Sequence, residues 1–193
     1  NISRPPMSST LLRRIPLLNP TTACSYKAAL INSYRNFSHS HIALPKPMGD
    51  VAPQTPDVLS KEELAKLFEL AKAAKNNSYS PYSKFRVGAA VLTSDNRMFS
   101  GCNVENASYG LTTCAERCAI FKAASEGMRG LKAVVVTTDV ADKIVYPCGA
   151  CRQVIAEFGN PIVVCVAPDG SMESTTMESL LPKSFGPADL MKE

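Results

Sequence analysis

Cys114-Ala115-Glu116 and Pro147-Cys148-Gly149-Ala150-Cys151 place three thiols and a carboxylate where helices are expected to begin. Proline favours the first helical turn, so Pro147 indicates that a helix starts at the Cys-x-x-Cys pair. Residues three apart lie on one helix face, which points both sulfurs of that pair the same way. Thr112 and Thr113, good N-cap residues, precede Cys114. We therefore expect two helix N-termini that bring three thiolates to one point.

Three cysteines in this arrangement indicate a zinc site with an open position. A structural zinc usually has four protein ligands, whereas a catalytic zinc keeps one position for water. Cys118, one helical turn after Cys114, is the main candidate for a fourth ligand, with Cys102 and Cys165 as others. The apolar residues 119–121 favour a buried core role for Cys118 instead. We predict one Zn²⁺ per chain, with the ligands Cys114, Cys148 and Cys151.

Glu116 is the residue that separates a catalytic site from a structural one. A glutamate in a first helical turn also complements the helix dipole, for at most about 1 kcal/mol. Beside a three-coordinate zinc, the same carboxylate can act as a general base, which is worth on the order of 10² to 10⁴ in rate. Arg117 and Arg152 each follow a predicted metal-site residue and are candidates for offsetting the thiolate charge. Solvated surface arginines are the alternative for both.

Other segments accompany these cysteines, and together they resemble the zinc deaminases. The all-cysteine pattern is similar to the small homotetrameric cytidine deaminases, over residues 60–190. The segments that carry the resemblance are 80–85, 101–107, 114–117, 147–153 and 181–187. The resemblance implies an α/β fold, with three α/β/α layers and a mixed five-stranded sheet.

The resemblance also implies an activity, namely zinc-dependent hydrolytic deamination of cytidine or deoxycytidine in pyrimidine salvage. Glu116 would move a proton from metal-activated water to N3 of the base and then to the departing amino group. Phe85 would stack on the pyrimidine, and Asn103 and Glu105 would hold the ribose hydroxyls. Tyr109 and Phe185 would close the site of a neighbouring subunit in a homotetramer. The implied substrate-binding set is Phe85, Asn103, Glu105, Tyr109, Ala115 and Phe185, and Arg117 is the implied outer neighbour of the metal ligands.

Three alternatives remain open. A non-enzymatic zinc protein would use Cys118 or Cys165 as a fourth ligand, and a redox protein would cycle Cys148 and Cys151 between dithiol and disulfide. A deaminase of a cytosine nucleotide or of a nucleoside antibiotic is the third. A phosphate-bearing substrate needs a basic or Gly-rich cradle, and no clear one is evident in the sequence.

Charge divides the 193 residues into two parts. Residues 1–49 hold six of the 21 Lys and Arg and no Asp or Glu, so 15 basic residues face all 17 acidic ones in the remainder. No basic stripe with interleaved aromatics follows, and we expect no nucleic-acid partner. No run approaches the roughly 18 apolar residues of a membrane span, and we expect no membrane partner. Seven cysteines with a metal-like spacing favour a reducing compartment.

The organisation predicted from these patterns is a leader, a linker and one domain. Residues 1–47 are rich in Arg, Ser and Thr, which is typical of a transit peptide and predicts mitochondrial import. An enzyme starting at Met48 in the cytosol is the alternative. Residues 48–59 form a Pro-rich linker before the domain at 60–190.

Within the domain, hydrophobic periodicity predicts helices and strands in the order α-β-β-α-β-α-β-β, which indicates a mixed sheet with helices on its faces. A capping box at Ser60 and Glu63 starts the first helix. The predicted helices are 60–77, 113–126, 148–158 and 178–181, and the predicted strands are 86–92, 98–103, 131–138, 162–167 and 172–177.

Overall fold

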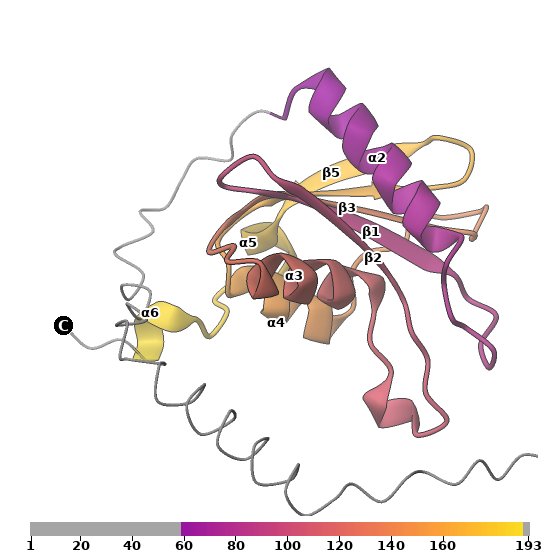
Figure 1. The fold of residues 1–193 in the computed structure, drawn as a ribbon. Helices are drawn as coiled ribbons and strands as arrows, with labels where there is room; N and C mark the ends of the chain where they lie inside the picture. The colour runs from indigo at the N-terminus through magenta and orange to yellow at the C-terminus, as the bar shows by residue number, and fades with distance from the viewer. Residues whose placement is uncertain (1–58, 191–193) are drawn as a thin grey trace, which may run out of the picture. The chain divides into compact units, whose positions relative to one another are not determined.

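The structure is a computed structural model that describes residues 59–190. The predicted leader 1–47 and all but the last residue of the predicted linker 48–59 lie outside the described residues. In chain order the elements are α2 (Lys61–Lys75), β1 (Val87–Thr93), β2 (Met98–Cys102), the 3₁₀ turn η1 (Tyr109–Leu111), α3 (Ala115–Ser125), β3 (Leu131–Thr138), α4 (Gly149–Ala156), β4 (Ile162–Val166), β5 (Met172–Thr176), α5 (Met177–Leu180) and α6 (Pro187–Leu190) (Figure 1).

The five strands form one mixed sheet in the order β2-β1-β3-β4-β5. The β3–β4 pair is parallel and the other three pairs are antiparallel. A parallel pair needs a crossover connection, and α4 lies in the one between β3 and β4. Helix α2 covers one face of the sheet, and α3 and α4 cover the other (Figure 1). The predicted mixed five-stranded sheet with helices on its faces is thus confirmed.

Alternation along the strands creates two separate cores, because successive strand residues point to opposite faces. In β1, Ala90 and Leu92 pack beneath α2, together with Leu67 from that helix. The intervening residues Ala89 and Val91 pack on the other side, against α3 and α4. All of these side chains are buried, so both faces of the sheet are covered.

Two glycines let the helices approach the sheet closely. A Cβ at Gly88 would lie 2.0 Å from the carbonyl oxygen of Ala71 in α2, and one at Gly101 would lie 2.5 Å from the backbone nitrogen of Ala119 in α3. Real Cβ atoms do not come so near to backbone. Gly101 therefore fixes the distance between β2 and the helix whose start carries Cys114.

Element boundaries agree with the sequence patterns in most places. The β3 prediction of 131–138 is correct at both ends, and the capping box of α2 forms between Ser60 and Glu63. The expected N-caps Thr112 and Thr113 are wrong, because Cys114 itself is the N-cap of α3. Neither η1 nor α6 was predicted.

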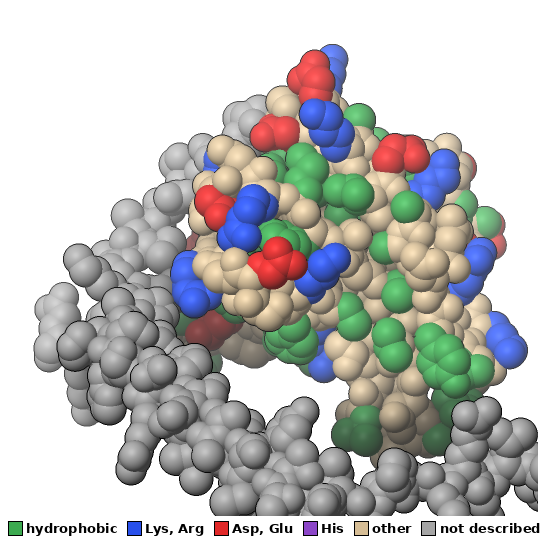
Figure 2. Space-filling view, viewed as in Figure 1, with side chains coloured by type: hydrophobic (Ala, Val, Ile, Leu, Met, Phe, Trp, Pro, Cys, Tyr) green, Lys and Arg blue, Asp and Glu red, His purple; other side chains and the backbone are tan. Residues whose placement is uncertain are grey.

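The described surface carries charges of both signs. On the face drawn in Figure 2, Lys and Arg side chains are interspersed with Asp and Glu side chains. Among the residues that the structure describes, no helix combines the length and apolar character that crossing a bilayer requires.

Candidate active site

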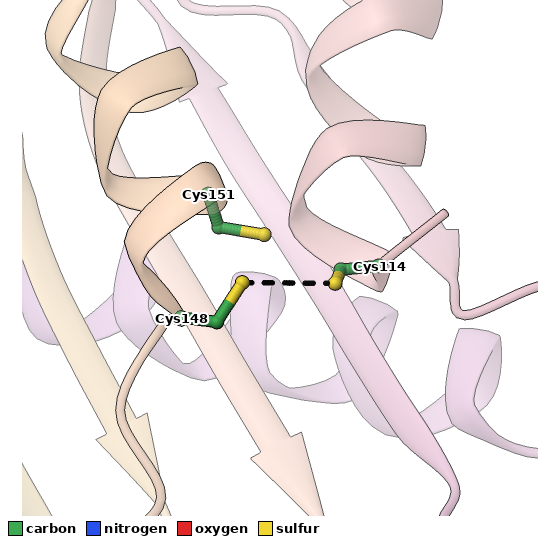
Figure 3. A group of neighbouring side chains, drawn as sticks. All are labelled: Cys114, Cys148 and Cys151. Atoms are coloured by element: carbon green, nitrogen blue, oxygen red, sulfur yellow. Dashed lines mark hydrogen bonds between the residues drawn. The ribbon is translucent and has the colours of Figure 1, made fainter. Parts of the chain in front are cut away.

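The three predicted zinc ligands meet at the starts of α3 and α4. Cys114 and Cys148 are the N-cap residues of these helices, and neither makes a side-chain capping bond. Cys151 follows in the first turn of α4. The three Sγ atoms lie within 4.8 Å of one another, and those of Cys114 and Cys148 are 3.9 Å apart (Figure 3). Zn–S bonds of about 2.3 Å in a tetrahedron place sulfurs about 3.8 Å apart, so the cluster fits zinc.

Electrostatics around Cys114 favour the thiolate, the form that binds metal. Hydrogen bonding from Cys151, assisted by Arg117, lowers the pKa of Cys114 to about 5 although burial opposes the shift. The Arg117 guanidinium donates to Cys114 Sγ at 3.5 Å and to the Thr112 carbonyl oxygen at 3.0 Å. Two helix N-termini add further positive potential at the same place. The same hydrogen bond raises the pKa of Cys151, so within this pair Cys114 is the sulfur that carries the negative charge.

The other three cysteines that the structure describes are directed elsewhere. Within the described residues, the metal-type cluster has three members and no fourth. Cys118 is half-buried beside Gly101 of β2, Cys102 donates to the Asn77 carbonyl oxygen at 3.3 Å, and Cys165 is buried in β4. Burial raises the pKa of Cys165 to about 12, which disfavours the thiolate. The prediction of a buried core role for Cys118 is therefore only partly met, because the residue is half-buried and belongs to neither core cluster.

Glu116 lies in the first turn of α3, beside the cluster. Its side chain is 4% exposed and faces the same pocket as Cys114 and Cys148. Burial raises the pKa of Glu116 above the ordinary glutamate value, and the nearby Cys114 charge acts in the same direction. A carboxyl group with a raised pKa can hold a proton as well as release it, which is the property that a proton shuttle needs.

The pocket in front of the cluster has a volume of about 360 Å³. Side chains from both zinc-site helices, from the loop before β1 and from the segment after β2 form its walls. The lining residues are Ser83, Phe85, Val87, Asn103, Glu105, Thr112, Cys114, Glu116, Val136, Val145, Tyr146 and Cys148. The predicted residues Phe85, Asn103 and Glu105 therefore share one cavity with the cluster.

Most of the Asn103 amide is engaged by the chain itself. Its Oδ1 accepts from the Val87 backbone N–H at 2.8 Å and from Ser78 Oγ at 2.6 Å, and its Nδ2 donates to the Phe85 carbonyl oxygen at 2.8 Å. One N–H of the amide is left for a ligand. Asn103 thus fixes the backbone that carries Phe85, in addition to facing the pocket.

Glu105 is held by backbone and hydroxyl donors. The carboxylate accepts from Tyr82 N at 2.9 Å, from Ser83 N at 3.3 Å and from Ser83 Oγ. The Ser83 hydroxyl bond is the main reason that the pKa of Glu105 is lowered. The pocket lining therefore includes a carboxylate that its hydrogen-bond donors keep in the charged form.

Three members of the implied substrate-binding set lie outside the pocket lining of this chain. Ala115 is fully buried beneath the site. Tyr109 and Phe185 are 74% and 60% exposed, and the Tyr109 ring packs against Tyr82 with their centroids 5.8 Å apart. Sequence reasoning missed Tyr146, which lines the pocket while its hydroxyl donates to Glu173 of β5. Its position directly before Pro147 was the available clue.

Arg152 makes backbone contacts rather than sulfur contacts. Its Nε donates to the Pro147 carbonyl oxygen at 2.8 Å and its Nη1 donates to the Leu180 carbonyl oxygen at 2.9 Å. Arg152 is thus held against backbone rather than solvated, and its offsetting of the thiolate charge stays a prediction. Arg117, in contrast, does contact a cluster sulfur.

Comparison with known proteins is consistent with this geometry. The profile of the family described as "Cytidine and deoxycytidylate deaminase zinc-binding region" matches residues 61–167. A probable cytidine deaminase of Dictyostelium discoideum is 49% identical over 133 residues, which cover 69% of this chain and 90% of that protein. A cytidine deaminase of Sporosarcina psychrophila is 48% identical over 130 residues, which cover 66% and 95%. The crystal structure of cytidine deaminase from Burkholderia pseudomallei matches with a TM-score of 0.60 at 46% identity, covering 63% of this chain and 98% of that one.

Proposed function

Because the chain belongs to the cytidine and deoxycytidylate deaminase family, we propose that it catalyses the zinc-dependent hydrolytic deamination of cytidine to uridine and ammonia. Deoxycytidine is included as a second substrate. The decisive observation is the buried carboxyl group of Glu116, which lines one pocket with Cys114 and Cys148, two members of the three-thiol cluster. A structural zinc site has no need for such an acid.

The proposed roles follow from position and chemistry. Cys114, Cys148 and Cys151 would hold zinc, which supplies water that is acidic enough to act as a nucleophile near neutral pH. The Glu116 carboxylate would accept one proton from the water and deliver it to N3 of the base. It would then take the proton of the new C4 hydroxyl and give it to the amino group, which leaves as ammonia when the C4–N bond breaks and C4=O forms. Burial keeps this acid away from bulk solvent and raises its pKa toward the working range. Arg117 holds Cys114 in place and offsets part of the negative charge on sulfur.

The pocket favours a nucleoside over a nucleotide. None of its lining residues is Lys or Arg, and Glu105 contributes a carboxylate whose lowered pKa keeps it charged. A phosphate group would meet repulsion there rather than a cradle. A ribose hydroxyl, in contrast, can donate to Glu105 and accept from the remaining N–H of Asn103, while Phe85 offers an aromatic face for the pyrimidine.

The proposal includes a homotetramer with sites shared between subunits. Tyr109 and Phe185 support this part, because both are large, exposed and outside the pocket of their own chain. Leu111, 69% exposed next to Tyr109, adds apolar surface that a neighbouring subunit would cover. Sedimentation of the purified protein tests it, since a monomer would leave these side chains without a function.

Mitochondrial import is a separate proposal that depends on residues 1–47. Their basic, acid-free composition supports it. Fusion of residues 7–47 to a fluorescent reporter tests it, and a diffuse cytosolic distribution would contradict it.

The central experiment measures ammonia release from cytidine, deoxycytidine and cytidine monophosphate, with zinc quantified in the same preparation. We expect turnover of both nucleosides, little turnover of the nucleotide, and one zinc per chain. Glu116→Gln keeps the shape of the side chain but removes its acid, and we expect zinc to be retained while turnover falls by on the order of 10² to 10⁴. Zinc without turnover of any nucleoside by the unmodified protein would favour the structural-zinc alternative.

A further inference from the structure

Helix α4 positions a second part of the chain in addition to Cys148 and Cys151. The two residues directly after Cys151 both bond to the C-terminal part of the described chain. Arg152 Nη1 donates to the carbonyl oxygen of Leu180, the last residue of α5, and Gln153 Nε2 donates to the carbonyl oxygen of Phe185 at 2.8 Å. Two consecutive side chains of one helix turn therefore hold both ends of the segment 180–185, which we call the C-terminal segment.

Arg152 also connects this segment to residues 147–148 at the start of α4, which we call the metal loop because Cys148 is a predicted zinc ligand. The same guanidinium donates through Nε to the carbonyl oxygen of Pro147, immediately before Cys148. A guanidinium offers several N–H groups in a rigid fork, so one side chain can hold two backbone carbonyls in a fixed relation. The carbonyl of Leu180 ends a helix and needs such a donor, because the last carbonyls of a helix have no partner within it.

The two ends of the C-terminal segment differ in their packing. Leu180 and Leu181 pack against the core beneath α3 and α4, whereas Phe185 is exposed. The Phe185 ring thus has no burial of its own to fix it in this chain. The Phe185 carbonyl oxygen instead accepts a hydrogen bond from the Gln153 side-chain amide. What holds Phe185 at its place is α4.

From these contacts we propose that Arg152 and Gln153 are positioning residues that tie the C-terminal segment to the metal loop. Arg152 sets the Pro147 carbonyl and hence the approach of Cys148, and the pair together sets where Phe185 is presented. Metal binding and the order of residues 180–185 are consequently coupled. The use of Phe185 by a neighbouring subunit belongs to the proposed function, on which that part of the inference rests.

The coupling is measured by hydrogen exchange of residues 178–186 in the full chain, with zinc bound and after chelation. We expect chelation to speed exchange there in the unmodified protein, because Cys148 and the Pro147 carbonyl lose their fixed position. Gln153→Ala removes one hydrogen bond and should speed exchange about two- to tenfold even with zinc bound. Gln153→Lys restores an N–H donor and should return exchange toward the original rate. Glu157→Ala, at the exposed C-cap residue of α4, is the matched control and should change nothing.

Arg152→Lys tests whether the two hydrogen bonds of the guanidinium matter or only its positive charge. Lysine keeps the positive charge, but one ammonium cannot reproduce the fork toward two carbonyls. We expect this variant to lose zinc to a chelator several times faster and to show a smaller effect of chelation on residues 178–186. Unchanged zinc loss would mean that charge alone matters, and exchange that is indifferent to zinc in the unmodified protein would overturn the coupling. Neither measurement uses turnover, so a failure to deaminate cytidine would refute the proposed function and leave this inference standing.

Discussion

Gly101→Ala tests whether the approach of α3 to the sheet sets the geometry of the site. The added methyl would lie 2.5 Å from Ala119 N, 2.8 Å from Cys118 Cβ and 2.9 Å from the Ala115 carbonyl oxygen. Ordinary contact begins at 3.4 Å, so the helix backbone and the strand must separate by close to an ångström. Two of the three clashing atoms are backbone, and no side-chain rotation relieves them.

The expected cost has two parts. Inserting a methyl group into a packed contact typically lowers the free energy of unfolding by about 1–3 kcal/mol. In a chain of this size, each kcal/mol lost lowers Tm by roughly 2–4 °C. The first turn of α3 carries Cys114 and Glu116, and a displacement of about 1 Å at a reacting group can cost about 10²-fold in rate. We therefore expect a lower Tm together with a loss of turnover that exceeds the loss of folded protein.

Differential scanning calorimetry, zinc quantification and ammonia release on one preparation measure all three quantities. Gly110→Ala is the matched control for stability, because a Cβ at that position meets nothing within 4 Å. If Gly101→Ala keeps both its Tm and its turnover, the close packing of α3 on β2 does not determine the site, and the reasoning is refuted.

Three further outcomes follow from the contacts described. Arg117→Lys loses the paired bonds to Thr112 O and Cys114 Sγ, and zinc affinity measured by chelator competition should fall about 10- to 100-fold; unchanged affinity would make Arg117 a bystander. Asp139 accepts from Lys75 Nζ at 2.7 Å and from Arg86 Nε at 2.6 Å. Partial burial opposes the shift, but these hydrogen bonds lower the pKa of Asp139. Its stabilisation, up to about 1 kcal/mol, is therefore complete above the unfolded pKa of about 3.9 and lost as pH falls through the lower folded value. Urea unfolding should show Asp139→Asn to be less stable at pH 7, with a gap that narrows below pH 4; a gap that widens in acid would contradict the sign. Zinc removal should lower Tm while far-UV circular dichroism persists, since both cores lie outside the cluster; complete unfolding would indicate a structural metal.

Local chemistry explains which parts of the fold were predictable from sequence. The α2 start follows from Ser60 and Glu63, whose reciprocal bonds need only three residues of separation. The β3 limits follow from a β-branched run between turns. Periodicity indicates a mixed sheet with helices on its faces, and the family resemblance adds the three layers and the five strands. The strand order β2-β1-β3-β4-β5 depends on packing between distant segments, which neither of them gives.

The site divides in the same way. The cysteines and Glu116 have spacings that metal and proton chemistry require, so sequence identifies them. Asn103 shows what sequence leaves out, because its backbone contacts exist only once the loop at Phe85 has folded beside β2. The direction of Arg152 is similarly a tertiary property, since the Leu180 carbonyl it binds lies 28 residues further along the chain.

The placement of the three sulfurs has a consequence for the order of folding. Cys114 and Cys148 are 34 residues apart, and they meet only when α3 and α4 have both docked on the same side of a sheet whose central strand lies between them in the chain. We therefore expect the ion to bind a nearly finished fold rather than to nucleate folding. Added zinc should leave the refolding rate of the chain almost unchanged and act instead by slowing escape from the native state.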